Sequence, residues 1–389
     1  MHRLNRRSFI KGSVLGASTA ILAAPALSSI STQLEKSGKS EKKFISRRLG
    51  KTGIELPVVS MGVMRADNPA LVRAALQSGI VHLDTAYGYQ KGKNESMLGE
   101  VLKDSPRSSF IIATKIPPDD KDVFLSKLET SLERLKMKYV DILYLHGATS
   151  RDAVLSPDAI EALKAAKASG KARHVGVSTH RNEPEVIQAA IDSGIYEVVL
   201  SAINFKQDHY PELKEAIARA AQAGIGIIGM KPMAGAFHDK ERTKPVNCKA
   251  ALKWVLQDPN VTTTIPGITT FDHLKENVSV NEDISLTESE KNDLAAGQAE
   301  GSLYCQGCEE CMPQCRKMLP IPEIMRAYMY TYGYADASLG RTLLTGLNVE
   351  ENPCRDCRTC TIECAKGFAI REKIADVSRL VSVPEEFLG

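Results

Sequence analysis

The stretch from Phe110 to Gly147, FIIATKIPPDDKDVFLSKLETSLERLKMKYVDILYLHG, contains one complete unit of the fold. Two apolar runs of strand length, 110–116 and 141–146, flank a segment at 124–137 whose apolar residues recur at helical spacing. Strands that are apolar almost throughout are typical of a parallel sheet covered by helices on its faces. The unit therefore predicts strand, helix, strand in an α/β protein.

The same alternation continues in both directions from this unit. Helical segments such as 158–168 and 211–223 separate further apolar runs, and several end at a glycine suited to a left-handed cap. The strand-length runs lie at 58–63, 81–86, 110–116, 141–146, 174–178, 198–204, 225–230 and 262–266. Eight strand–helix units close naturally into a TIM barrel, so we expect an α/β protein with a (β/α)8 barrel over residues 44–285.

A hairpin precedes the barrel in this prediction, because Gly50 and Gly53 bracket a turn within residues 44–55. An open, doubly wound sheet is the structural alternative. That alternative predicts a G-x-G-x-x-G motif after the first strand, and the sequence has none there.

The amino terminus carries a targeting pattern. Arg6 and Arg7 precede an uncharged run at 12–34, and Ala24-Pro25-Ala26 offers a cleavage site of small residues. The pattern resembles a twin-arginine (Tat) signal, which implies the Tat translocase as a partner and export to the periplasm. We expect a signal peptide at 1–26, a linker at 27–43 and no stable membrane span after processing. A single membrane anchor is the alternative, although Pro25 interrupts the run short of the roughly 20 residues that a span needs.

Composition excludes one class of partner. Hydrophobic residues make up 43% of the chain and charged residues 25%, as in ordinary soluble proteins. Beyond the first 26 residues the basic and acidic side chains nearly balance. No stretch interleaves basic and aromatic residues, so we expect no nucleic-acid partner.

Four polar residues follow or end neighbouring strands of the predicted barrel. Asp84 and Tyr89 lie in VHLDTAYGYQKGKNE (residues 81–95), Lys115 ends the third strand and His146 ends the fourth. The carboxyl ends of barrel strands meet at one face, where active sites form. A buried lysine needs a counter-charge, and Asp84 on the adjacent strand can supply it. The four residues therefore predict one site.

These residues resemble the motifs of the aldo-keto reductase family: D-T-A-x-x-Y at 84–89, Asn94-Glu95, a strand-ending Lys115 and LYLH ending at His146. The resemblance covers residues 44–285. It implies hydride transfer between NAD(P)H and a small carbonyl or alcohol substrate, such as a sugar. It also implies that Tyr89 donates the proton, Lys115 lowers its pKa, Asp84 orients Lys115 and His146 aligns the carbonyl oxygen. Such help is needed, because a tyrosine with a pKa near 10 is a poor acid at neutral pH.

The cofactor segments keep only part of the family pattern. The residues that the resemblance places at the nucleotide are Ser178, Asn204, Met230, Lys231, Glu276 and Asn277. Met230 stands where an aromatic residue usually stacks on the nicotinamide, while Gly267 and His273 replace the cations that grip the 2′-phosphate of NADP. Selectivity for NADP is therefore not expected. Alternatively, Glu276 and Asn277 only cap or solvate the last helix.

Two cysteine runs of identical C-x2-C-x2-C-x3-C spacing predict two [4Fe-4S] clusters. They comprise Cys305, Cys308, Cys311 and Cys315 in the first run, and Cys354, Cys357, Cys360 and Cys364 in the second. In two-cluster ferredoxins the fourth cysteine of each run binds the other cluster, which would exchange Cys315 and Cys364. Disulfides or zinc are the alternatives. Cys248 is interpreted as a small apolar residue.

The cysteine runs define a second domain, ferredoxin-like, at 301–389, joined to the barrel by a connecting helix at 286–300. The helical spacing between the runs favours a small helical module. Tyr328, Tyr330, Tyr332 and Tyr334 are expected to pack beneath the clusters, with an electron route as the alternative.

Two functions remain open at the level of sequence. The first is an exported aldo-keto-reductase-like oxidoreductase whose clusters serve electron transfer or structure. Because a hydride carries two electrons and each cluster takes one, electron transfer would require a redox partner protein or a flavin that splits the pair; otherwise the clusters are structural. The second is an electron-transfer or binding protein whose barrel is catalytically altered.

Overall fold

The computed structural model describes residues 43–239, 241–357 and 359–388. The expected signal peptide at 1–26 and all of the linker except its last residue lie outside this part of the chain. A short antiparallel hairpin comes first, formed by β1 (Ser46–Arg48) and β2 (Glu55–Pro57). The prediction of an amino-terminal hairpin is confirmed.

Eight parallel strands form the body of the protein, in the order of a barrel. They are β3 (Met61–Gly62), β4 (His82–Asp84), β5 (Ile111–Ile116), β6 (Val140–Leu145), β7 (Ala172–Thr179), β8 (Val198–Ala202), β9 (Gly226–Met230) and β10 (Val261–Thr264). Each strand pairs with the next along the chain, and parallel bridges join Val59 to Thr264 and Gly62 to Gly267. The sheet is therefore a nearly closed (β/α)8 barrel, as the sequence predicts.

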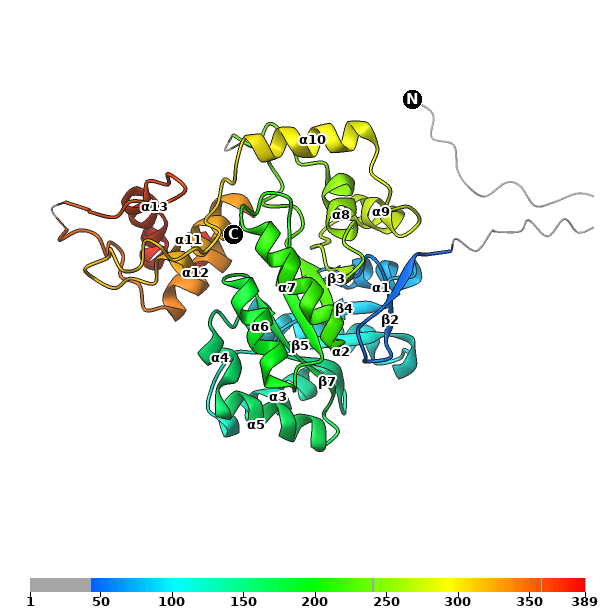
Figure 1. Cartoon of the computed structure of the whole chain (residues 1–389). Helices are drawn as coiled ribbons and strands as arrows, with labels where there is room; N and C mark the ends of the chain where they lie inside the picture. Colours follow the sequence, from blue (N-terminus) through cyan, green and yellow to red (C-terminus); the bar gives the residue numbers. More distant parts are fainter. Residues whose placement is uncertain (1–42, 240, 358, 389) are drawn as a thin grey trace, which may run out of the picture. The chain divides into compact units, whose positions relative to one another are not determined.

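Helices follow the strands and cover the barrel (Figure 1). They are α1 (Pro69–Gln77), α2 (Lys93–Leu102), α3 (Lys121–Leu135), α4 (Arg151–Leu155), α5 (Pro157–Ala168), α6 (Glu183–Ser193), α7 (Tyr210–Ala223), α8 (Cys248–Leu256), α9 (Phe271–Val280) and α10 (Glu288–Ala299). The 3-10 helices η1 (Tyr89–Gly92) and η2 (Arg107–Ser109) lie on either side of α2. Among the described residues, no helix is long and apolar enough to cross a membrane.

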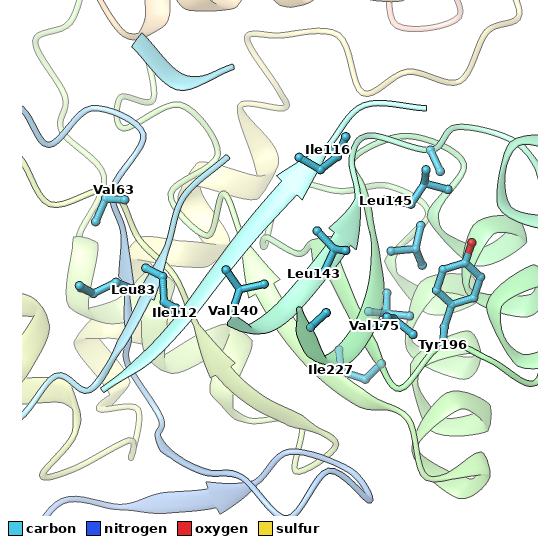
Figure 2. Close-up of a cluster of buried hydrophobic side chains, with 14 of the residues drawn as sticks. Val63, Leu83, Ile112, Ile116, Val140, Leu143, Leu145, Val175, Tyr196 and Ile227 are labelled. Carbon is cyan, nitrogen blue, oxygen red and sulfur yellow. The ribbon is translucent and has the colours of Figure 1, made fainter. Parts of the chain in front are cut away.

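Alternation along the strands separates two cores. Ile112 on β5 and Leu143 on β6 face the helices, where they join the large core shown in part in Figure 2. The next residues along, Ala113 and Tyr144, belong to a second core inside the barrel. Because side chains alternate between the faces of a strand, Lys115 points inward with Ala113.

The hairpin closes the amino-terminal end of the barrel. Leu49 and Leu56 are fully buried and belong to the interior core. Gly50 permits the close approach, because its φ is +51° and a Cβ there would lie 2.5 Å from the carbonyl oxygen of Gly224. The opposite end of the barrel, where the strands finish, is left for the site.

The carboxyl-terminal segment is helical in its described residues. It contains α11 (Ile321–Tyr328), the π-helix η3 (Met329–Gly333), α12 (Ala337–Gly346), α13 (Ile370–Val377) and the 3-10 helices η4 (Ser378–Ser382) and η5 (Glu385–Phe387). A core of its own includes Ile324, Leu344 and Ile374, with Cys311 and Cys315 among its members. A helical module agrees with the expected architecture, and α10 lies within the expected connecting helix.

Candidate active site at the barrel mouth

Strand register brings the predicted polar residues together. Asp84 pairs with Ala113 and Lys115 pairs with Tyr144 across neighbouring strands. His146 follows β6 two residues after Tyr144, which places it at the same end of the barrel. The alternation that builds the apolar interior therefore also directs Asp84 and Lys115 into the barrel mouth.

Lys115 and Asp84 form a buried ion pair, with side-chain exposures of 1% and 2%. The ammonium donates to Asp84 Oδ1 and to the Thr85 carbonyl oxygen at 2.6 Å. Burial raises the pKa of Asp84 and lowers the pKa of Lys115, and the opposite charge of each partner opposes both shifts. The pair is thus a fixed dipole rather than two free charges.

Tyr89 lies at the start of η1, in the segment that follows β4. Its ring centre is 5.0 Å from Lys115 Nζ and 5.9 Å from the ring centre of His146, in an edge-to-face arrangement. Burial, together with the charges of Lys115, Arg326 and Lys231, lowers the pKa of His146 to about 3, so the imidazole is neutral. A neutral imidazole can donate one N–H to a carbonyl oxygen.

The electrostatics around Tyr89 differ from the expectation in one respect. Burial raises its pKa well above 10, and the charge of Asp84 adds to this shift. The cation that opposes it is Arg326 of α11, whereas the ammonium of Lys115 is committed to Asp84 and Thr85. The cation that lowers the pKa of Tyr89 thus comes from the carboxyl-terminal segment.

Asn94 and Glu95 fix the loop that carries Tyr89. The Asn94 amide accepts from Thr85 Oγ1 at 2.6 Å and donates to the Val63 carbonyl oxygen at 2.7 Å. Glu95 accepts from Thr114 Oγ1 at 2.7 Å and pairs with Arg134 at 3.2 Å. Both residues are buried, so this part of the motif positions the site without contacting it.

The expected nucleotide residues are distributed along the barrel mouth. Ser178 is buried near the end of β7, where its hydroxyl oxygen accepts from the Gly147 N–H at 2.9 Å. Asn204 follows β8, and its side-chain oxygen accepts from the Lys206 N–H at 3.1 Å. Met230 ends β9 and packs against the interior core, and Lys231 follows it.

Glu276 and Asn277 lie on α9, the helix that follows β10, the last strand of the barrel. Asn277 is buried and Glu276 lies beside it on the same helix. The expected nucleotide residues thus lie at or after the ends of strands β7 to β10 in turn. Gly267 and His273 are exposed and bring no cation to that end.

A pocket at the barrel mouth is lined by both the barrel and the carboxyl-terminal module. Barrel residues in its wall include His180, Asn204 and Lys231, while Arg326 and Tyr334 come from the module. Arg181 connects the two, since it pairs with Glu309 at 2.9 Å and with Glu323 at 3.2 Å.

The module residues at this mouth could not be found by sequence reasoning. Tyr334 was expected to pack beneath the clusters, but it lines the pocket and lies 5.5 Å from the Arg65 guanidinium. Tyr328 does pack in the module core, next to Lys373. Arg326 stands among apolar residues of an amphipathic helix, and that position alone gives no signal of contact with a distant barrel.

The motif cysteines act on one another across the two runs. Burial, together with the smaller effects of Cys311, Cys308 and Cys364, raises the pKa of Cys305 to about 11. Burial also raises the pKa of Cys354, with smaller effects from Cys357, Cys360 and Cys315. Cys364 and Cys315 thus each act on a cysteine of the other run, although Cys315 also acts on Cys311 of its own run.

Pocket geometry places Cys315 with the second run, because one cavity is lined by Cys315, Cys354, Cys357 and Cys360. All nine cysteines are free thiols, so no disulfide is formed. Within the described residues, no group of three or more His, Cys, Asp or Glu side chains is placed to hold a metal ion. The side-chain geometry therefore gives no support to a zinc site or to the predicted clusters.

Comparison with known proteins identifies the barrel. Residues 59–250 match the model of the aldo/keto reductase family. An uncharacterised oxidoreductase, YqkF of Bacillus subtilis, is 28% identical over 63% of this chain and 93% of its own length. The L-galactose dehydrogenase of Arabidopsis thaliana is 26% identical over 66% of this chain and 94% of its own.

A solved structure shares the fold. The holo form of an aldo-keto reductase from Bacillus halodurans superposes with a TM-score of 0.57, at 22% identity, over 67% of this chain and 98% of its own. These matches show that the chain is an oxidoreductase whose residues 59–250 match the aldo/keto reductase family, and the solved structure shows that the barrel fold is shared.

Proposed function

We propose that the protein reduces a small carbonyl compound, or oxidises the corresponding alcohol, at the mouth of its barrel. The observation that carries this proposal is the cluster of Tyr89, neutral His146 and the buried Lys115–Asp84 pair. A bound nicotinamide cofactor would supply or accept the hydride. Ser178, Asn204, Met230, Lys231, Glu276 and Asn277 are the residues that would hold it.

Each member of the cluster has one role in the proposed reaction. In reduction, His146 would donate its N–H to the carbonyl oxygen and orient the substrate. As the oxygen gains negative charge, the Tyr89 hydroxyl would transfer its proton there, which yields the alcohol. The Lys115–Asp84 pair holds its charges beside the Tyr89 ring, and Arg326 favours the tyrosinate that remains.

We further propose that NAD and NADP are used without strong selectivity. Gly267 and His273 are exposed, and the His273 ring shares a 3.2 Å hydrogen bond with Thr269 Oγ1. Neither brings a permanent cation to the 2′-phosphate position. We expect KM values for NADH and NADPH within about tenfold of each other, and an NADPH preference far beyond that would contradict the proposal.

The cysteine module is proposed to hold two [4Fe-4S] clusters. Cys305, Cys308, Cys311 and Cys364 would bind one, and Cys315, Cys354, Cys357 and Cys360 would bind the other. The grouping of thiols across the two runs supports this division. Whether the clusters pass electrons to a redox partner protein or only hold the module together is a separate question, which a reduction titration would answer.

The proposed substrate is small and polar, and a sugar is one candidate. The name of the Arabidopsis relative, L-galactose dehydrogenase, supports alcohol or carbonyl chemistry on a sugar. The proposal for localisation is export through the Tat translocase to the periplasm. Replacing Arg6 and Arg7 by Lys should retain the protein in the cytoplasm, whereas Arg3→Lys, the same change outside the pair, should not.

Tyr89→Phe tests the proposed reaction, with Tyr87→Phe as the matched control. The Tyr87 ring lies 4.7 Å from the Arg134 guanidinium and packs against the outer core, two residues from the motif position. General acid catalysis typically contributes about 100-fold to 10,000-fold, so Tyr89→Phe should lose that much kcat while Tyr87→Phe loses little. The assay uses a panel of aldehydes, ketones and sugars with both nucleotides.

Two results would contradict the proposal. Equal turnover by Tyr89→Phe and the wild type, within about twofold, would mean that the cluster is not the catalytic apparatus. No turnover of any panel member, in protein with a full iron content, would favour an electron-transfer or binding protein with an altered barrel.

A further inference from the structure

The pocket between the barrel and the module carries more positive charge than its acids can balance. Its wall contains Lys231, Arg326 and Arg181 as cations, with Glu183 and Glu323 as acids. These charges come from opposite sides, because Lys231 follows β9 and Arg326 lies on α11. The module is therefore part of the wall rather than a separate neighbour.

The acids of the pocket are already engaged. Glu183 accepts from Gln207 at 3.2 Å and pairs with His209 at 3.0 Å. Glu323 pairs with both Arg181 and Arg326. Neither carboxylate forms an ion pair with Lys231, although the charge of Glu183 raises the pKa of that lysine.

Lys231 has no hydrogen-bond or ion-pair partner for its ammonium within the described residues. Burial, and to a smaller extent the charge of Arg326, lower its pKa to about 7, while the charge of Glu183 opposes this shift. The Nε atom of Arg326 and the Nε2 atom of His180 are also buried without a hydrogen-bond partner. Three side chains in the wall of one pocket thus each have a nitrogen without a hydrogen-bond partner.

We infer that this pocket binds an anionic group of the substrate, a carboxylate or a phosphate ester, between Lys231 and Arg326. The inference rests on the proposed function and names its substrate class: short carbonyl or alcohol compounds with an anionic oxygen group. The proposed anion site adjoins the catalytic cluster, because His180 in its wall follows β7 at the end of the barrel where His146 follows β6.

The arrangement also assigns the module a part in specificity. Arg326 belongs to the segment that follows the first cysteine run, and Cys305 lines the same pocket. Loss of the module would remove one of the two cations and open the wall. The barrel alone would then keep the catalytic cluster but not the preference for anions.

Paired substrates test the inference in the full-length protein with its clusters intact. 4-Oxobutanoate against butanal isolates a carboxylate, and glyceraldehyde 3-phosphate against glyceraldehyde isolates a phosphate. We expect kcat/KM to be at least tenfold higher for the charged member of one pair, and that pair identifies the anion. Arg326→Gln should lower kcat/KM for both members, because Arg326 also acts on Tyr89. The loss should be about 10-fold to 100-fold larger for the charged member, because only that member also loses a charge-assisted contact.

Lys244→Gln is the matched control, since Lys244 is exposed, pairs with Glu300 at 3.1 Å and lies outside the pocket wall. It should change neither member of either pair. Titration calorimetry with malonate and with inorganic phosphate gives a readout independent of turnover, and Arg326→Gln should weaken the binding of the preferred anion about tenfold or more.

The outcomes separate this inference from the proposed function. Anion binding that depends on Arg326, in a protein that turns over no carbonyl compound, would keep the anion site and reject the reaction. Turnover with equal kcat/KM for charged and neutral members, together with no anion binding, would reject the anion site and keep the reaction. Equal losses for both members in Arg326→Gln would also overturn it, because they indicate a general structural role.

Discussion

The barrel mouth and the cysteine module hold their functional side chains in different ways. In the barrel, Asp84 and Lys115 occupy paired strands, and backbone hydrogen bonds fix their positions before any ligand arrives. In the module, the cysteines lie in turns and irregular segments between α10 and α13, and their thiols are near one another without being joined. A site built on a sheet is specified by the sheet, whereas a site built on loops depends on what it binds.

Removal of iron should have the largest effect on the difference between the barrel and the module. Chelation after oxidation should loosen α11, α12 and α13, because their core includes two cysteines and little other regular structure supports the loops. Hydrogen exchange should rise throughout the module and stay slow in β5 to β8. Equal protection in the treated and untreated protein would mean that the module folds without clusters.

Single cysteine changes should sharpen the division between the two groups. The intact protein should contain about eight iron atoms, and Cys364→Ser should lower this to about four by removing the cluster of the first run. Cys248→Ser is the control and should leave the iron content unchanged. If Cys364→Ser instead removed the cluster of Cys354, Cys357 and Cys360, each run would bind its own cluster. The double variant Cys308→Ser/Cys364→Ser distinguishes the two cases. If both residues bind the same cluster, its spectra should match those of Cys364→Ser.

Lys115→Met probes the barrel site in the same way. It leaves Asp84 as an unpaired buried charge, so the free energy of unfolding should fall by about 3 to 5 kcal/mol. Iron content should not change, because the sheet rather than the module loses the interaction. Urea unfolding followed by circular dichroism measures the loss, and recovery in Asp84→Asn/Lys115→Met is expected. A single variant as stable as the wild type would show that the pair is not charged in the folded protein.

The smallest expected effect is on stability, from the half-buried Glu197 and its partners His174 and Lys167 at the amino-terminal end of the barrel. Burial alone would raise the pKa of Glu197, but hydrogen bonds from His174 and Lys167 lower it to about 2. A lowered carboxyl pKa stabilises the fold above the unfolded value near 4.5, and this contribution is lost as the pH falls from there towards 2.

We expect Glu197 to contribute about 1 to 2 kcal/mol at neutral pH, below the full linkage value because its side chain is 27% exposed. In Glu197→Gln the difference in stability from the wild type should disappear as the pH falls through this range. A difference that stays constant from pH 6 to pH 2.5 would show that packing, rather than charge, is responsible.

Regular periodicity explains why so much of the fold could be predicted. Each strand and helix of the barrel is a local pattern, so eight alternations, the hairpin and the approximate strand positions follow from neighbouring residues alone. The same holds for Asp84, Lys115 and His146, since a residue near a strand end has a known place in a barrel. The spacing of the cysteines also predicts that Cys315 and Cys364 are exchanged between two clusters, and that stays a prediction.

Tertiary contacts decided what stands around those residues. The sequence determined which side chains lie at the barrel mouth, because strand alternation is a short-range property. Only the folded chain shows that Arg326 and Tyr334, more than 200 residues beyond Asp84 along the chain, line the same pocket as Lys231. Such contacts depend on how α11 packs against the loops after β7 and β9, and no local pattern encodes that packing. The packing of α11 therefore supplies the cation that lowers the pKa of Tyr89, whereas the anion that raises it, Asp84, belongs to the sequence motif.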